Sequence, residues 1–333
     1  MEKLKKALNM ILYLAAIFLV LGSVLSLFRN AEIRYLKMLD FPRIQFFILI
    51  IIILIVLIMV IKKWKWYNYL ITIGLLIGLI IHSVFLINYT VLVPVAVPTV
   101  ENLDSSDSQF SLLMANVKMS NKKAQPLIKL ISLQKPDLIL AMEVDEWWYK
   151  NLNILKNDYP YSQHSINEVT YGMVLYSKFP FKETEINYFN NNQVPSFKST
   201  ITLENDKSFS LYCIHPVPPT HFKNLPDNAG QEETSLIKLG REVEEQRLPT
   251  VVAGDFNDVV WSYADELTDT KNVFYDVRVG RGFYNSYNAH NFLMKWPLDH
   301  VLVTKEFELK KLERLSKIGS DHFPIYVELV LKE

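Results

Sequence analysis

The stretch Pro136–Val144, PDLILAMEV, joins an uninterrupted apolar run to a carboxylate. Residues 138–142 have the length and composition of a buried strand, and Glu143 follows directly at its end. The segment before it, residues 121–134, carries apolar side chains at helical spacing. This alternation of helix and strand, with a polar side chain displayed where the strand ends, predicts an α/β domain.

The same arrangement recurs through the rest of the C-terminal region. Further apolar runs that we predict as strands cover residues 110–115, 171–177, 208–214, 250–253, 300–304 and 325–330. Polar signatures at or beside the runs are Asn116, Glu143, His215, Gly254–Asn257, Leu298–His300 and Ser320–His322. Singly they are weak signals, because a Gly-Asp-x-Asn after a strand is commonly an Asx turn, and a single His or Glu there is commonly structural.

Residues 1–100 have a different composition from the rest. Three nearly uncharged apolar stretches, 7–28, 44–61 and 69–88, are each close to the ~20 residues that a helix needs to cross a bilayer. Residues 46–60 contain no polar side chain, so the middle stretch is apolar all round, unlike an amphipathic surface helix. We therefore expect a multi-pass protein of the cell membrane, anchored in the lipid bilayer by three helices. A cleaved signal peptide is less favoured, because the first stretch is longer than a typical h-region.

The neutral total charge hides two oppositely charged regions. Residues 1–100 hold ten Lys and Arg against three Asp and Glu, whereas residues 101–333 hold 25 against 32. The acidity of the second region is unhelpful for attraction to duplex DNA, so nucleic acid is not favoured as a substrate. No Lys or Arg occurs between the third apolar stretch and Lys118, and this bias predicts an extracytoplasmic C-terminal domain. The polar residues 101–109 indicate a linker to a domain over 110–333.

The single cysteine, Cys213, excludes an intramolecular disulfide and a cysteine-ligated zinc site. It lies within the apolar run 210–214, where a buried strand thiol is the favoured interpretation.

Six elements in order along about 110–332 carry a family resemblance. They are Met114–Val117, Pro136–Val144, Tyr171–Ser177, Gly254–Asn257, Leu298–Val303 and Gly319–Pro324. The region resembles the endonuclease/exonuclease/phosphatase superfamily. With the three helices, the segments 215–219 and 257–262 look like a bacterial membrane-bound branch of it. The resemblance implies a four-layer α/β sandwich, in which two mixed sheets pack face to face under covering helices. It also implies a site at one edge, where strand ends converge.

The resemblance also implies roles for individual residues. Glu143 would bind a metal ion, supported by Asn116 and assisted by Asp321, and oxygen ligands without sulfur suit Mg²⁺ or Mn²⁺. Asp299 would hold one nitrogen of His322, whose other nitrogen would act as general base or contact the phosphate. The remaining roles fall to three residues. Asp255 would orient the water or act on the leaving group, Asn257 would donate to a phosphate oxygen, and His215 would be a second phosphate contact.

The favoured function is that of a membrane-anchored, divalent-metal-dependent phosphoesterase acting on phosphodiesters or phosphomonoesters. A DNA or RNA nuclease is the alternative within hydrolases, and a catalytically silent membrane-tethered binding module is the alternative outside them. The sequence indicates no protein partner. Two apolar segments, 216–225 and 283–296, either fill the core beneath the sheet edge or touch lipid or an apolar part of the substrate.

Overall fold

The computed structural model describes residues 2–31, 33–102, 107–220, 222–227, 234–246, 248–262, 268, 270 and 272–332. Two compact units divide the chain, Met1–Asn88 and Tyr89–Glu333.

The first unit contains three long apolar helices, α1 (Glu2–Leu25), α3 (Arg43–Val60) and α4 (Trp66–Leu86). By length and composition, Glu2–Arg29, Arg43–Val60 and Trp66–Tyr89 are each able to cross a membrane. Short helices connect or follow them: η1 (Ser26–Ala31), α2 (Arg34–Lys37), η2 (Met38–Asp40) and η3 (Ile87–Tyr89). The predicted stretches 7–28, 44–61 and 69–88 fall on these helices. Small and branched side chains, including Ala16, Ile50 and Leu75, pack where the helices meet.

Buried polar side chains also lie between these helices. The carboxylate of Asp40 accepts hydrogen bonds from both Arg29 and Arg43. Arg43 is fully buried and donates from Nη1 to Ser26 Oγ at 3.1 Å. Charges enclosed in this way are tolerated because each has an oppositely charged partner.

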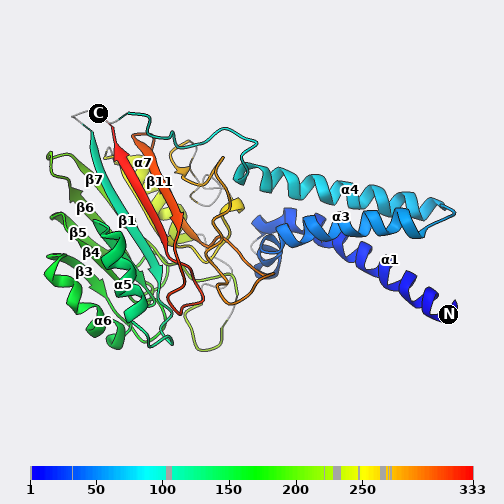
Figure 1. The fold of residues 1–333 in the computed structure, drawn as a ribbon, viewed down its shortest axis with the longest axis horizontal. Coiled ribbons are helices and arrows are strands. Elements are labelled where there is room, and N and C mark those ends of the chain that lie inside the picture. Colours follow the sequence, from blue (N-terminus) through cyan, green and yellow to red (C-terminus); the bar gives the residue numbers. More distant parts are fainter. Residues whose placement is uncertain are drawn as a thin grey trace. The chain divides into compact units, whose positions relative to one another are not determined.

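The second unit is built on two mixed six-stranded sheets (Figure 1). The first sheet has the order β11-β12-β1-β2-β4-β3 and the second β5-β6-β7-β8-β10-β9. The first comprises β1 (Ser108–Asn116), β2 (Leu138–Met142), β3 (Tyr161–Ser165), β4 (Met173–Ser177), β11 (Phe307–Arg314) and β12 (Ile325–Leu331). The second comprises β5 (Phe181–Asn187), β6 (Ser196–Thr202), β7 (Ser208–Cys213), β8 (Thr250–Asp255), β9 (Tyr275–Asp276) and β10 (Asp299–Val303).

Each sheet has a parallel pair at its centre, β1 with β2 and β7 with β8. Parallel neighbours need a long crossover, and helices α5 (Gln125–Gln134) and α7 (Thr234–Glu245) lie in the two crossovers. Helix α5 ends at Lys135, whose left-handed backbone (φ 47°) and following Pro136 stop it. Helix α6 (Glu146–Leu152) begins at Asp145, whose side chain accepts the Trp148 N–H at 2.9 Å. The short helices η4 (Asn153–Asn157) and η5 (Val260–Ser262) complete the unit.

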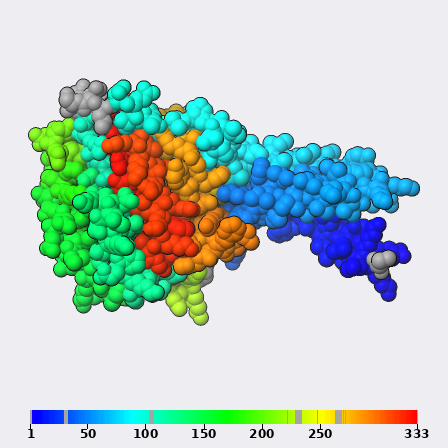
Figure 2. Space-filling view, viewed as in Figure 1, coloured from blue at the N-terminus to red at the C-terminus, as the bar shows by residue number. Residues whose placement is uncertain are grey.

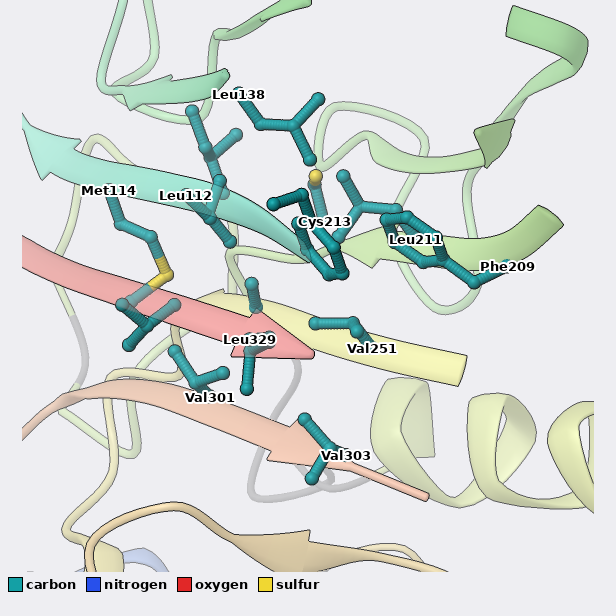
Figure 3. Close-up of a cluster of buried hydrophobic side chains, with 14 of the residues drawn as sticks. Leu112, Met114, Leu138, Phe209, Leu211, Cys213, Val251, Val301, Val303 and Leu329 are labelled. Carbon is teal, nitrogen blue, oxygen red and sulfur yellow. The ribbon is translucent and has the colours of Figure 1, made fainter. Parts of the chain in front are cut away.

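The two sheets pack face to face through apolar side chains. Leu112 and Met114 of β1 belong to the same buried cluster as Leu211 and Cys213 of β7 (Figure 3). The alternate residues of β1, Leu113 and Ala115, point the other way and pack with helices α5 and α6. Helix α7 covers the outer face of the second sheet. The predicted four-layer α/β sandwich is therefore confirmed.

Cys213 is a free thiol buried in this inter-sheet core, as predicted. Burial raises the pKa of the Cys213 thiol, so it is an inert part of the core.

Residues 89–100 belong to the second unit and pack on its two sheets. The hydroxyl of Tyr89 donates to the carbonyl of Val260, Val97 is buried in the inter-sheet core, and Thr99 pairs with Leu309 of β11. The two units thus divide after Asn88, whereas we placed the sequence boundary near residue 100. Of the predicted linker 101–109, residues 103–106 lie outside the described residues, and β1 already begins at Ser108.

Candidate active site

Polar side chains from both sheets converge at one edge of the sandwich. In the first sheet, Asn116 ends β1, Glu143 follows β2, and His322 lies just before β12. In the second, His215 follows β7, Asp255 ends β8 and Asp299 begins β10. The parallel pairs place the carboxyl ends of β1, β2, β7 and β8 at the same edge, and the antiparallel strands β10 and β12 start there.

The backbone around these residues adopts conformations that ordinary residues avoid. Glu143 and Asn257 have positive φ angles of 60° and 53°. At Gly254, which precedes Asp255, a Cβ atom would lie 1.9 Å from the carbonyl oxygen of Ile214. At Gly172, a Cβ atom would lie 2.0 Å from the carbonyl oxygen of Val144. Only glycine permits these close approaches, and strained residues of this kind concentrate at functional sites.

His322 lies between two carboxylates. Its Nδ1 is 2.8 Å from Asp299 Oδ2, and its Nε2 is 3.4 Å from Asp255 Oδ2. All three side chains are buried. The arrangement fixes the orientation of the imidazole ring and leaves Nε2 directed at Asp255.

The backbone of Asp299 is held by two further contacts. Its backbone N–H donates to Ser286 Oγ at 3.1 Å, and the buried guanidinium of Arg278 donates to its carbonyl oxygen. The positions of Asp299 and His322 are thus fixed by a second layer of buried polar contacts.

These contacts change the acidity of the buried groups. Burial alone would lower the pKa of His322, but the charges of Asp255 and Asp299 and the hydrogen bond to Asp299 outweigh it and raise the pKa to about 10. Burial would raise the pKa of Asp299, yet the charge and hydrogen bond of His322 hold it below its ordinary value. Burial raises the pKa of Asp255 despite the positive charge of His322. Perturbed groups at a strand-end cluster are typical of active sites.

Asn116 joins Glu143 to this cluster. Its amide Nδ2 donates to Glu143 Oε1 at 2.9 Å and to Asp255 Oδ2 at 3.0 Å. The Met119 N–H donates to Glu143 Oε2 at 3.2 Å. Burial raises the pKa of Glu143 in spite of these hydrogen bonds, so a cation beside it would be stabilising.

Two groups of side chains fit a divalent metal ion. Glu143 offers carboxylate oxygens, which are donors that Mg²⁺ and Mn²⁺ prefer. The amide nitrogen of Asn116 faces Glu143 and its amide oxygen accepts the Lys118 N–H at 3.0 Å, so Asn116 would have to turn its amide to bind the same ion. Asp255, Asp299 and His322 each offer one ligand atom, and these atoms lie within 4.8 Å of one another. In the second group, however, His322 Nδ1 and Asp299 Oδ2 already satisfy each other at 2.8 Å.

Asp321 lies at the rim of the site and is paired with a lysine. Lys118 Nζ donates to Asp321 Oδ2 at 2.7 Å, and this hydrogen bond raises the pKa of Lys118. The positive charge beside Asp321 is therefore that of Lys118, which lies two residues after Asn116 in the sequence.

His215 and Asn257 line the side of the cluster toward the segment after β7. His215 is buried, with Nε2 3.8 Å from Asp255 Oδ2 and its ring 5.1 Å from that of Tyr171. Within the described part of the chain, its Nδ1 has no hydrogen-bond partner, and burial lowers the pKa of His215. Asn257 donates from Nδ2 to the Pro216 carbonyl at 2.9 Å and thereby anchors this segment.

Sequence reasoning did not single out Lys118, Arg278 or Ser286 for a role. Lys118 stands close to the Asn116 signature and was open to detection, whereas Arg278 and Ser286 lie in loops without a strand or motif beside them. Tyr171 belongs to a motif that we quoted, but only the fold reveals its contact with His215.

Residues 283–296 are packed in one part and exposed in another. Tyr287 and Trp296 stack on each other with ring centroids 6.0 Å apart, and Tyr287 also forms a β-bridge with His322. Phe292, Leu293 and Met294 are exposed. In the segment 216–225, Val217 is buried and Phe222 is exposed, and His221 lies outside the described residues.

Comparison with known proteins identifies relatives of this architecture. Residues 115–322 match the model of the family described as "Endonuclease/Exonuclease/phosphatase family". No curated protein matches the chain. Solved structures match about two thirds of it at low sequence identity, and so report on the fold alone.

Three such structures illustrate the likeness. D. rerio TDP2 complexed with single-strand DNA product is 17% identical, with 68% of this chain and 99% of that chain covered and a TM-score of 0.54. The Bacteroides vulgatus endonuclease/exonuclease/phosphatase is 17% identical, with 68% and 100% covered and a TM-score of 0.53. The human Nocturnin catalytic domain with bound sulfate is 13% identical, with 67% and 93% covered and a TM-score of 0.52.

Proposed function

Because the chain belongs to the endonuclease/exonuclease/phosphatase family, we propose that it is a membrane-anchored, metal-dependent phosphoesterase that hydrolyses phosphodiesters or phosphomonoesters. The observation that carries this proposal is the joined cluster Asp299–His322–Asp255–Asn116–Glu143, in which each neighbouring pair is 3.4 Å apart or less. A binding module has no need for such an excess of buried acids.

Glu143 and Asn116 would hold Mg²⁺ or Mn²⁺, assisted by Asp321, which is close enough in space for its charge to act on Glu143. Such an ion, when bound, neutralises charge on the phosphate oxygens and on the departing oxygen. Asp321 would be the weakest of the three ligands, since the Lys118 ammonium already neutralises it. The Lys118 ammonium would add a fixed positive charge at the rim that faces the substrate.

The Asp255–His322 pair would activate the attacking water. The water oxygen forms the new bond to phosphorus as the bond to the alkoxide breaks, and the water proton passes to the pair. The pair then returns that proton to the alkoxide, so the site ends in its starting state. Asp299 keeps the His322 ring in register through its 2.8 Å contact.

His215 and Asn257 would bind the phosphate. The unpartnered Nδ1 of buried His215 is a polar atom that a substrate oxygen would satisfy. The Asn257 amide has a second N–H in addition to the one that reaches Pro216, and this second donor would serve a phosphate oxygen.

A substrate panel tests the proposal directly. Purified full-length protein is assayed in detergent with Mg²⁺ and with Mn²⁺ on a phosphodiester, a phosphomonoester, a phospholipid and DNA. We expect metal-dependent release from at least one phosphoester, abolished by chelator. Absence of turnover on every member, from protein that binds metal and is folded, would contradict the proposal. Turnover on DNA alone would favour the nuclease.

We also propose that the three apolar helices span the cell membrane with the catalytic unit on its extracytoplasmic side. The support is the absence of Lys and Arg between the third helix and Lys118, together with the basic residues around Lys3 and Lys63. A reporter that is active only outside the cytoplasm, fused after Glu333, should be active. Activity of a cytoplasm-specific reporter at the same position would reverse the orientation.

A further inference from the structure

The loop that precedes β10 has an ordered apolar tip that faces solvent. Phe292, Leu293 and Met294 are 88%, 75% and 48% exposed. The side-chain oxygen of Asn291 accepts the N–H of Leu293 at 2.9 Å and that of Met294 at 3.0 Å, which fixes the turn. Consecutive large apolar side chains displayed on a defined turn are typical of a surface that contacts another apolar phase.

Basic side chains gather beside this tip. The ring of Phe323 lies 5.5 Å from Lys295 Nζ, 4.5 Å from Arg314 Cζ and 5.7 Å from Lys317 Nζ. Lys295 Nζ is also 6.0 Å from the ring of Phe292, so the basic cluster is continuous with the tip. Residues 101–333 are acidic as a whole, which makes this local concentration of positive charge notable.

The base of the same loop is bonded to the catalytic segment. The Phe323 N–H donates to the Ser286 carbonyl at 2.8 Å, and the Ala289 N–H donates to the Asp321 carbonyl at 2.7 Å. Tyr287 forms its β-bridge with His322. In the space-filling view, the orange surface of this region adjoins the orange-red surface of β11 and β12 (Figure 2). The exposed tip and the catalytic histidine therefore belong to one connected substructure.

We propose that Phe292, Leu293 and Met294 enter the head-group layer of a bilayer while Lys295, Arg314 and Lys317 contact anionic phospholipid head groups. An apolar tip ringed by cations complements a surface that is apolar within and anionic at its rim. The third candidate span ends at Tyr89, which is also the first residue of the catalytic unit. If that helix spans a bilayer, the catalytic unit is tethered directly to the bilayer. The hydrolysed phosphoesters are then those of membrane lipids, a conclusion that rests on the proposed function.

Fluorescence quenching tests the contact without any assay of activity. The only native cysteine, Cys213, is buried, so Leu293→Cys can be labelled selectively in the full chain. The labelled protein is placed in nanodiscs of phosphatidylcholine, with or without phosphatidylglycerol, that contain lipids with a quencher near the head group. The matched control is Leu133→Cys on α5, which is 69% exposed. We expect strong quenching at position 293 and little at 133. Equal quenching at the two positions in both lipid mixtures would overturn the proposal.

Charge reversal tests the role of the basic cluster. In the Leu293→Cys background, Lys295→Glu with Lys317→Glu should remove the extra quenching that phosphatidylglycerol produces. The control pair Lys123→Glu with Lys129→Glu makes the same change in net charge near or on α5 and should preserve it. If both pairs reduce quenching equally, the effect is one of total charge, and the assigned cluster is wrong.

Substrate choice tests the functional consequence. Phe292→Ser with Met294→Ser should lower turnover of a bilayer phospholipid by about tenfold, with turnover of a water-soluble phosphodiester unchanged. Quenching at position 293 without hydrolysis of any substrate would refute the proposed function and leave the surface supported. Hydrolysis of the soluble ester without quenching would refute the surface and leave the function supported.

Discussion

Each unit of this protein buries a cluster of charged side chains, and the two clusters are balanced differently. Among the described residues of Met1–Asn88, the carboxylate of Asp40 lies between the guanidinium groups of Arg29 and Arg43. In Tyr89–Glu333, the buried carboxyl groups of Asp255 and Asp299 and the partly buried one of Glu143 gather around the imidazole of His322, with that of His215 3.8 Å from Asp255.

The difference separates a structural cluster from a functional one. Buried charges that each contact an opposite charge in good geometry hold elements together. Buried acids in excess of their cationic partners cost stability in the free protein and are expected where a cation or a substrate completes the set. The comparison makes each cluster testable by removing one charge from it.

The largest effect should follow from removing a catalytic charge. We expect His322→Ala and Glu143→Gln each to reduce hydrolysis by about 10²–10⁴-fold, the range typical of general acid–base groups. Rates on a water-soluble phosphodiester, with circular dichroism and thermal melting as the check on folding, measure this. Asp299→Asn should act in the same direction but less strongly, because it misorients His322 without deleting it. Turnover near that of the wild type in either main variant would sink the assignment.

Removing the charge of Asp40 should affect stability and not chemistry. Asp40→Asn leaves two buried guanidinium groups with a weaker partner, and breaking a buried ion pair of this kind costs about 3–5 kcal/mol. We expect a lower melting temperature in detergent and an unchanged rate on the water-soluble ester at low temperature. Glu2→Gln, which removes an exposed carboxylate from α1, is the control and should be neutral. A selective loss of activity in folded Asp40→Asn protein would break the comparison.

Metal binding should stabilise the second unit and identify its ligands. An ion at 100 times its dissociation constant adds about 2.7 kcal/mol to the stability of the state that binds it. We expect Mn²⁺ to raise the melting temperature of the wild type and of Asp299→Asn, and to have little effect on Glu143→Gln. The reverse pattern would assign the ion to Asp255, Asp299 and His322 instead of Glu143 and Asn116.

The smallest effect, counted for each pH unit, should be a dependence of stability on pH. The pKa of His322 is raised from 6.5 to about 10, so its imidazolium stabilises the fold fully below pH 6.5. This contribution is lost as the pH rises toward 10, by at most about 1.4 kcal/mol per pH unit. Melting of the chelator-treated protein should therefore fall more steeply between pH 7 and 9 in the wild type than in His322→Gln. If the melting temperatures of the two proteins fall equally with pH, the carboxylates of Asp255 and Asp299 do not raise the pKa of His322.

Strands with continuous apolar runs were predictable from the sequence, and strands rich in polar side chains were not. The predicted strands near 138–142, 208–214 and 325–330 agree closely with β2, β7 and β12, because strands buried on both faces need continuous apolar sequence. Strands β5 and β11 escaped prediction, since FKETEIN and FELKKLER place polar side chains at exposed sheet edges. Residues 89–100 are as apolar as the three N-terminal helices, so only tertiary packing reveals that Val97 belongs to the core between the two sheets.

The identities of the site residues were accessible through the resemblance, but their mutual contacts were not. The ion pair of Lys118 with Asp321 and the hydrogen bond of Asn257 to Pro216 join positions far apart in sequence. No local pattern encodes such pairs, because they depend on how the two sheets are placed against each other.

The contacts of the active site that join the two sheets depend on the distance between the sheets. Asn116 reaches Asp255 across the sheets at 3.0 Å, and His322 reaches Asp299 at 2.8 Å. Neither sheet holds the whole set of site residues. Catalysis would therefore require that the two sheets be packed against each other correctly. If the two sheets moved slightly apart, the strands would remain paired within each sheet but hydrolysis would stop. Turnover should consequently decline on heating before the strand signal does, since a displacement of an ångström breaks a hydrogen bond long before it unpairs a sheet.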